Sequence, residues 1–124
     1  MNSQGIAWNA IVVEPDAFDS TVAFFTETFG IKPSAQFPGF AMIPQDNGGI
    51  FEVYAKGSTP EYGYNAGGVA FGFRVEDIEA ASAELAVAGV ELLGEITRLD
   101  TGYAYRHFRG PDGRVYGLNQ SASA

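Results

Sequence analysis

Glu52 and His107 are the two side chains of this sequence that could carry acid–base chemistry. Glu52 lies between Phe51 and Val53 in an apolar segment, where an unpaired carboxylate would be costly to bury. We therefore expect Glu52 to be solvated in a cleft, paired with a group such as Arg74 or His107, or functional. As a functional group it would be a general base, with His107 or a tyrosine hydroxyl as its acid partner. His107, the only histidine, could equally be a hydrogen-bonded strand residue.

The composition excludes several kinds of site and partner. The chain has no cysteine, which excludes thiol catalysis, cysteine-ligated zinc and iron–sulfur clusters. Seven Lys and Arg against fifteen Asp and Glu give a net charge of −8, which argues against a nucleic-acid partner and favours cationic ligands. A hydrophobic fraction of 46% is enough for a folded core. Because no apolar run reaches membrane-spanning length and the first residues lack the features of a secretory signal, we expect a cytoplasmic protein with no membrane partner.

The elements that must position these side chains occur in two similar halves, about 5–57 and 68–120, joined by a connector rich in Gly and Tyr. In the first half, residues 8–13 predict a strand. Asp19 or Ser20 is the expected cap of the helix that follows, and Gly30 is the expected left-handed residue at its end. Four aromatic and aliphatic residues at helical spacing predict that helix: Phe18, Val22, Phe25 and Phe29.

The second half repeats this order. Residues 69–75 predict a strand, and Asp77 predicts the cap of a helix that ends at Gly89. Turn sequences at residues 46–49 and 111–113 connect the last two predicted strands of each half. The sequence thus predicts an α+β fold, with two βαβββ repeats whose sheets curve together around a central cleft, in a single domain spanning 1–124.

Two segments of the second half make the chain similar to a known group of proteins. Residues 73–78 (FRVEDI) lead into an Ala-rich helix, and residues 108–113 (FRGPDG) contain a Pro-Asp-Gly turn after an aromatic residue. Their order and spacing resemble the vicinal oxygen chelate superfamily, which includes glyoxalase I, extradiol dioxygenases, and the fosfomycin- and bleomycin-resistance proteins. The resemblance implies a cleft that binds small molecules, and it also implies a homodimer.

Metal-dependent members of that superfamily place four ligands on the cleft face, and the resemblance assigns these positions here to Asn9, Glu52, Ala70 and Gly117. Only Glu52 has a side chain that could ligate a metal strongly. A divalent transition metal needs three or four donors, preferably imidazole or carboxylate. We therefore expect no metal and no other cofactor, as in the branch that resembles bleomycin-resistance proteins.

Alternation along the strands extends the predicted cleft face. Its candidate ligand-binding residues are Asn9, Ile11, Glu52, Tyr54, Ala70, Gly72, Arg74, Tyr103, Tyr105, His107, Val115 and Gly117. Val13, Ile50 and Asn119 share this parity. The opposite parity, which the helices would cover, comprises Ala10, Val12, Phe71, Phe73, Val75 and Phe108. The small residues at 70 and 117 predict an enlarged hollow, whose tyrosine walls suit a planar or cationic ligand.

These features favour a metal-independent protein that binds, and could sequester, a small cationic or aromatic molecule. One alternative is a metal-independent enzyme that uses Glu52 as general base. Another is a metal-dependent lyase or dioxygenase, which the missing ligands disfavour. The sequence leaves the roles of three aromatic residues open. Trp8 could cover a sheet edge or a partner chain. Tyr62 and Tyr64 could lie over the cleft mouth or belong to a linker.

Overall fold

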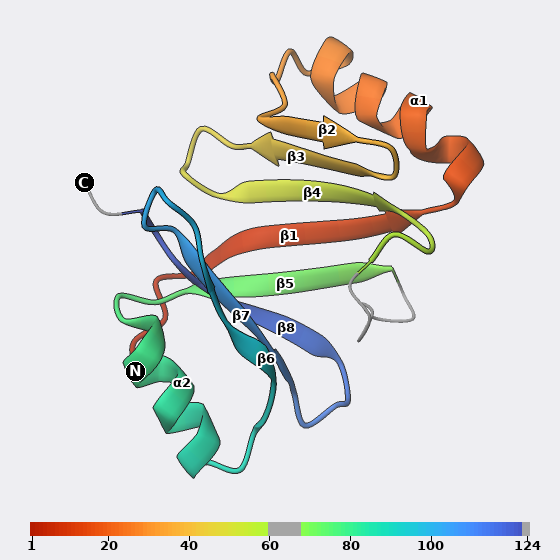
Figure 1. Cartoon of the computed structure of the whole chain (residues 1–124). Coiled ribbons are helices and arrows are strands. Elements are labelled where there is room, and N and C mark those ends of the chain that lie inside the picture. The colour runs from red at the N-terminus through yellow and green to blue at the C-terminus, as the bar shows by residue number, and fades with distance from the viewer. Residues whose placement is uncertain (60–67, 123–124) are drawn as a thin grey trace. The chain divides into compact units, whose positions relative to one another are not determined.

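The computed structural model describes residues 1–59 and 68–122, which form an α+β fold with eight strands (Figure 1). Contacts divide the chain into two units. The amino-terminal unit is Asn9–Val69, and the carboxy-terminal unit combines Met1–Trp8 with Ala70–Ala124. Each unit contains one βαβββ repeat, so the predicted fold class is confirmed. That the two sheets curve around a shared cleft stays a prediction, and Tyr62 and Tyr64 lie outside the described residues.

The amino-terminal unit orders its strands β2-β3-β4-β1. Their bounds are Ile6–Val13 for β1, Ala35–Phe37 for β2, Phe40–Pro44 for β3 and Ile50–Ala55 for β4. The three later strands are antiparallel neighbours, and the predicted turn closes β3 onto β4 through a hydrogen bond from Gln45 N to Gly49 O of 2.9 Å. Apolar residues of β3 and β4 form a core with the helix: Phe18, Val22, Ala41, Ile43, Val53 and Ala55.

The helical segment of this unit differs from the single helix that the sequence predicts. It consists of a 3-10 turn at Pro15–Ala17, the α-helix α1 at Phe18–Ala23, and a π-helical turn, η2, at Phe24–Thr28. The wider π turn closes with a bond from Phe29 N to Phe24 O, and it leaves Phe29 60% exposed, outside the buried stripe. The predicted caps are also wrong, because the helix starts after Ala17 with no side-chain cap. Gly30 has the predicted left-handed backbone, with φ of 72°.

The carboxy-terminal unit orders its own strands β5-β8-β7-β6. Their bounds are Val69–Arg74 for β5, Glu91–Arg98 for β6, Ala104–Arg109 for β7 and Val115–Gln120 for β8. β5 and β8 are parallel, with Gly72 opposite Gly117, and the other pairs are antiparallel. The first residues of the chain join this sheet, because Gln4 N donates to Arg74 O and Arg74 N donates to Gly5 O. α2, at Ile78–Val87, packs on β6, β7 and β8.

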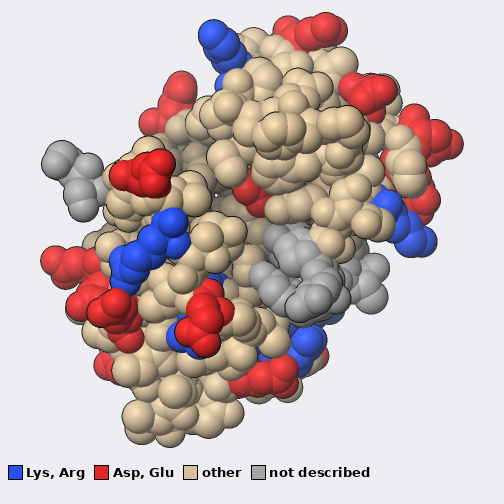
Figure 2. All heavy atoms as spheres, in the orientation of Figure 1, with Lys and Arg blue, Asp and Glu red and all other residues tan. Residues whose placement is uncertain are grey.

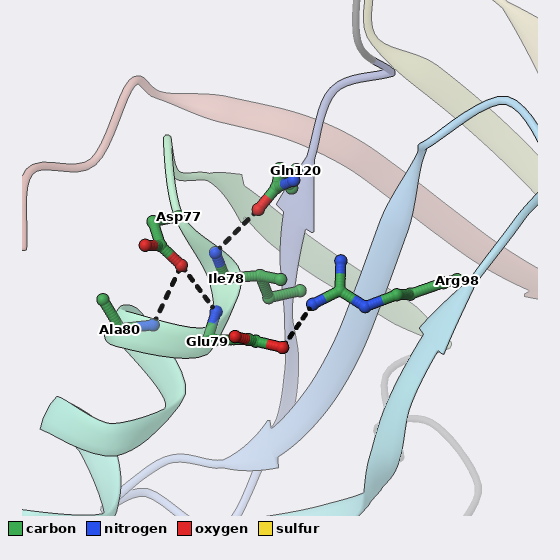
Figure 3. A network of polar contacts seen from close by, with 6 residues as sticks. All are labelled: Asp77, Ile78, Glu79, Ala80, Arg98 and Gln120. Carbon is green, nitrogen blue, oxygen red and sulfur yellow. Dashed lines mark hydrogen bonds and ion pairs between the residues drawn. The ribbon is translucent and has the colours of Figure 1, made fainter.

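Asp77 caps α2 as the sequence predicts. Its Oδ1 accepts hydrogen bonds from Glu79 N at 3.0 Å and Ala80 N at 3.1 Å, while the amide before them, Ile78 N, donates to Gln120 Oε1 of β8 at 2.8 Å (Figure 3). These bonds satisfy three of the amides that a helix start leaves without partners. The cap and the Gln120 contact therefore fix the position of α2 on its own sheet.

Charged side chains lie on the surface, and Figure 2 shows acidic groups spread over the visible face. The ion pairs are solvent-exposed, for example Arg98 with Glu79 at 2.9 Å, so each contributes little to stability. None of the helices within the described residues has the length and apolar character needed to cross a membrane.

Candidate functional site

Strand pairing separates two faces in the sheet of the carboxy-terminal unit. Leu118 packs in one core cluster with Ile78 of α2, and Phe73 is paired with Leu118, so this parity faces the helix. Gly72 and Gly117 form the adjacent pair and lie on the opposite face. The residues that pairing and alternation bring to this helix-free face are Ala70, Gly72, Arg74, Tyr105, His107, Val115, Gly117 and Asn119. In the carboxy-terminal unit, alternation therefore predicted correctly which residues share this face. Tyr103 is linked to the same face because Asn119 Nδ2 donates a hydrogen bond to Tyr103 Oη.

Trp8 fills the space that the two glycines leave. A Cβ atom built at Gly117 would lie 3.1 Å from Trp8 Cε3, and one built at Gly72 would lie 2.8 Å from the same atom. The indole is 4% exposed, and its ring centroid lies 5.2 Å from that of His107 in an edge-on arrangement. The predicted hollow beside Gly117 is therefore wrong, because the indole occupies it. Gly72 and Gly117 leave room for the Trp8 ring because they have no side chain.

His107 lies in the middle of this aromatic layer. Its strand register places it opposite Gly117, and its ring meets that of Tyr105 edge-on at 5.7 Å. Only 6% of the residue is exposed, and burial lowers the pKa of its imidazole from 6.5 to about 4. At neutral pH the ring is therefore uncharged, which suits a hydrogen-bonding group better than a general acid.

The first strand has the opposite parity to the predicted one. Ile11 and Val13 pack against the core that contains Phe18 and Val22, so they face α1, and Asn9 shares their side of β1 by alternation. A hydrogen bond from Lys56 N to Val13 O fixes this register against β4. The predicted placement of Asn9, Ile11 and Val13 on the helix-free face is therefore wrong by one residue. The residues of β1 with the parity that points away from α1 are Trp8, Ala10 and Val12.

Glu52 lies on the helix-free face of β4, as alternation predicts. Its neighbours in the strand, Phe51 and Val53, belong to the α1-facing core. Glu52 is almost entirely buried, with 7% of the residue exposed, and its Oε1 accepts a hydrogen bond from Tyr54 Oη at 3.3 Å. The Tyr54 ring in turn contacts Phe40 of β3, with centroids 5.0 Å apart. The amino-terminal unit therefore holds a desolvated carboxylate beside aromatic rings.

One hollow of the amino-terminal unit lies elsewhere, at the turn between β3 and β4. It has a volume of about 310 Å3 and is lined by Ile31, Pro44, Gln45, Asp46 and Asn47. None of the predicted site residues lines it.

A sequence model described as the Glyoxalase/Bleomycin resistance protein/Dioxygenase superfamily matches residues 9–115. The chain belongs to this superfamily. No curated protein matches the chain. The superfamily assignment agrees with the two βαβββ repeats and with the residues that carried the resemblance.

Solved structures of the superfamily fold are similar to this chain at low identity. A superfamily member from Vibrio splendidus 12B01 is 18% identical with a TM-score of 0.62, covering 94% of this chain and 100% of that one. Methylmalonyl-CoA epimerase of Streptomyces coelicolor, in complex with 2-nitronate-propionyl-CoA, is 22% identical with a TM-score of 0.66, covering 98% and 100%. The Mn(II)-bound glyoxalase of Novosphingobium aromaticivorans is 16% identical with a TM-score of 0.71, covering 98% and 40%. These likenesses show the fold alone.

The side chains of this superfamily member do not fit a divalent metal at the four positions that the resemblance assigns. The Ala70 and Gly117 side chains have no metal-ligating atom. Asn9 faces α1, and the residues of β1 that point the other way next to it, Trp8 and Ala10, do not ligate metals. Among residues 1–59 and 68–122, no group of three or more His, Asp or Glu side chains is placed to hold an ion. Glu52 remains as a single carboxylate, fewer donors than such an ion needs.

Proposed function

We propose that this superfamily member binds a small aromatic or cationic molecule without a metal ion. The observation that carries the proposal is the desolvated Glu52 carboxylate, which lies with Tyr54 on a strand face free of helix. A buried carboxylate attracts a cationic group more strongly than an exposed one does, because little water screens the two charges. The net charge of −8 also attracts cations toward the protein at long range.

The aromatic part of the proposal rests on the carboxy-terminal unit. Trp8, Tyr105 and His107 form a continuous edge-on contact on its helix-free face. Such rings offer stacking and cation–π contacts of about 1 kcal/mol each. Because the pKa of His107 is lowered to about 4, its imidazole adds no positive charge that would repel a cation at neutral pH.

Three related probes test this function: 1-methylbenzimidazole, which is neutral, 1,3-dimethylbenzimidazolium, which is a permanent cation, and benzimidazole. Trp8 is the only tryptophan of the chain, so its fluorescence reports binding at the helix-free face of the carboxy-terminal unit. We expect saturable quenching that EDTA does not change. We also expect Glu52→Gln to weaken binding of the cation at least several-fold, measured by isothermal titration calorimetry, while leaving the binding of 1-methylbenzimidazole unchanged. No quenching by any of the three at millimolar concentration, or quenching only after a divalent metal is added, would contradict the proposal.

A metal-independent enzyme is the second candidate, and the Tyr54–Glu52 hydrogen bond is the observation that favours it. In this case Glu52 would be the general base and the Tyr54 hydroxyl, rather than the neutral His107, would be the acid partner. Incubation of a bound compound with wild-type and Glu52→Gln protein separates the candidates. Retained binding with lost turnover favours the enzyme, whereas a compound recovered unchanged from both proteins favours sequestration. Stoichiometric metal in the purified protein would instead favour the metal-dependent lyase or dioxygenase.

We further propose that the chain forms a homodimer. Large apolar side chains of the amino-terminal unit remain exposed, among them Phe24 at 49%, Phe29 at 60% and Phe37 at 61%. Exposed apolar groups of this size are typical of association surfaces. Sedimentation equilibrium measures the mass directly, and a monomer at every concentration tested would contradict this proposal.

A further inference from the structure

The Asn119 amide is a buried polar group of the carboxy-terminal unit, and one of its two polar atoms has no hydrogen-bond partner among the described residues. Asn119 is 4% exposed and its Nδ2 donates to Tyr103 Oη at 2.5 Å. Its Oδ1 has no hydrogen-bond partner among the described residues. Buried acceptors in folded proteins are almost always paired, so an unpaired one calls for an explanation.

The environment of this oxygen limits what could pair with it. Because Nδ2 is bonded to Tyr103, Oδ1 points the other way, and a Cβ built at Gly72 would collide with it. The same Cβ would stand 2.8 Å from Trp8 Cε3. The free oxygen therefore lies over the bare backbone of Gly72, next to the edge of the indole. A side chain at Gly72 would occupy the space in which this oxygen lies.

We propose that Asn119 Oδ1 accepts a hydrogen bond from an N–H or O–H group of the ligand, while the ligand's ring contacts Trp8. This inference rests on the proposed function and narrows it, because an amide oxygen can only accept. The ligand must therefore carry a donor at the rim of its planar part. Because Oδ1 is buried, the ligand can reach it only if the Trp8 ring shifts away from Gly72, and such a shift would alter the fluorescence of Trp8.

The choice of a donor-bearing planar ligand follows from the neighbouring groups. Tyr103 and Tyr105 have ring centroids 6.2 Å apart on the same side of the sheet, and Trp8 borders Oδ1 from β1. These aromatic side chains accommodate a flat ring. Asn119 then distinguishes ligands by whether the edge of that ring carries a hydrogen-bond donor. A site built to pair a buried polar group rejects an analogue that lacks the matching donor.

Benzimidazole and 1-methylbenzimidazole test the inference, because they differ only in replacing the ring N–H by N–CH3. Binding is followed by Trp8 fluorescence at pH 8, where both rings are neutral. We expect wild-type protein to bind benzimidazole at least tenfold more tightly. Asn119→Leu, which keeps the size of the side chain but removes the acceptor, should abolish this preference. Asn47→Leu is the matched control: it makes the same exchange in the turn between β3 and β4, where Asn47 Oδ1 accepts from Gly49 N, so the preference should persist.

The outcomes separate this inference from the proposed function. Equal binding of both probes by wild-type protein, or a preference that survives Asn119→Leu, overturns the role of Asn119 but leaves aromatic binding intact. If neither probe binds to the wild-type protein, both the role of Asn119 and the proposed function are wrong. If Asn119→Leu does not fold, Asn119→Ser provides the same comparison, since its shorter side chain withdraws the acceptor from Gly72.

Discussion

The indole of Trp8 lies against the backbone of Gly72, so closely that a methyl group at this glycine would stand 2.8 Å from Trp8 Cε3. The same methyl group would collide with Asn119 Oδ1. Real Cβ atoms essentially never show such contacts, so one of the neighbours would have to move. The glycine is therefore required by the side chains around it.

Gly72→Ala should lower the free energy of unfolding by about 1–3 kcal/mol, the usual cost of overpacking a core. Urea unfolding followed by circular dichroism measures this change. Gly117→Ala is the matched control, because its Cβ would meet Trp8 at 3.1 Å and should cost less. A Gly72→Ala protein as stable as wild type would show that the Trp8 ring is not tightly seated.

His107 should make stability depend on pH between about 6.5 and 4. Burial lowers the pKa of His107 to about 4, while in the unfolded chain it returns to 6.5. Between these values the unfolded state binds the extra proton, so His107 makes stability fall as pH decreases, by up to about 3 kcal/mol. Above pH 6.5 its contribution is complete and constant.

The His107→Asn variant isolates this effect, because all carboxylates are the same in both proteins. Urea unfolding at pH 7.5 and pH 4.5 should show a smaller acid destabilisation for the variant than for wild type. Equal losses in both proteins, or an imidazole NMR signal of the folded protein that titrates near pH 6.5, would contradict the prediction.

Asp77→Ala should destabilise the protein by about 1 kcal/mol, because Glu79 N and Ala80 N lose the acceptor at the start of α2. Asp77→Asn retains a side-chain oxygen and should retain most of the stability. Thermal unfolding of the three proteins side by side tests the cap. If Ala and Asn behave alike, the cap oxygen does not stabilise α2.

Ser82→Ala should stabilise the protein by about 1 kcal/mol. Ser82 is 4% exposed in α2, and its Oγ has no partner among the described residues, so removing it ends a desolvation cost and raises helix propensity. Ser20→Ala is the comparison, since Ser20 is exposed and its Oγ donates to Ala17 O at 3.1 Å. A loss of stability in Ser82→Ala would mean that its hydroxyl has a partner.

The predicted strand faces started from the four positions that the resemblance assigns, and alternation extended them along each strand. In the carboxy-terminal unit the positions that the resemblance assigns to Ala70 and Gly117 have the parity that strand pairing shows, so alternation from them gave the correct face. In β1 nearly every residue from Ala7 to Val13 is apolar, so the strand has no alternation that could have corrected the position that the resemblance assigned to Asn9. Register there is set by Lys56 and β4, far along the chain.

Two further features had no sequence signal. The π turn at Phe24–Thr28 changes the phase of the helix after Ala23, which periodicity of 3.6 residues cannot reveal. The place of Trp8 could not be read either, because Gly72 and Gly117 indicate missing side chains without saying what replaces them. Tertiary packing supplied that answer.

The contact units divide β1 between Trp8 and Asn9, although it is one continuous strand. A polypeptide of residues 68–124 made alone would therefore lack the indole that packs on Gly72 and Gly117. The boundary between the repeats in the amino-acid sequence therefore does not coincide with the boundary between the contact units, because the second repeat depends on a side chain that precedes the first helix.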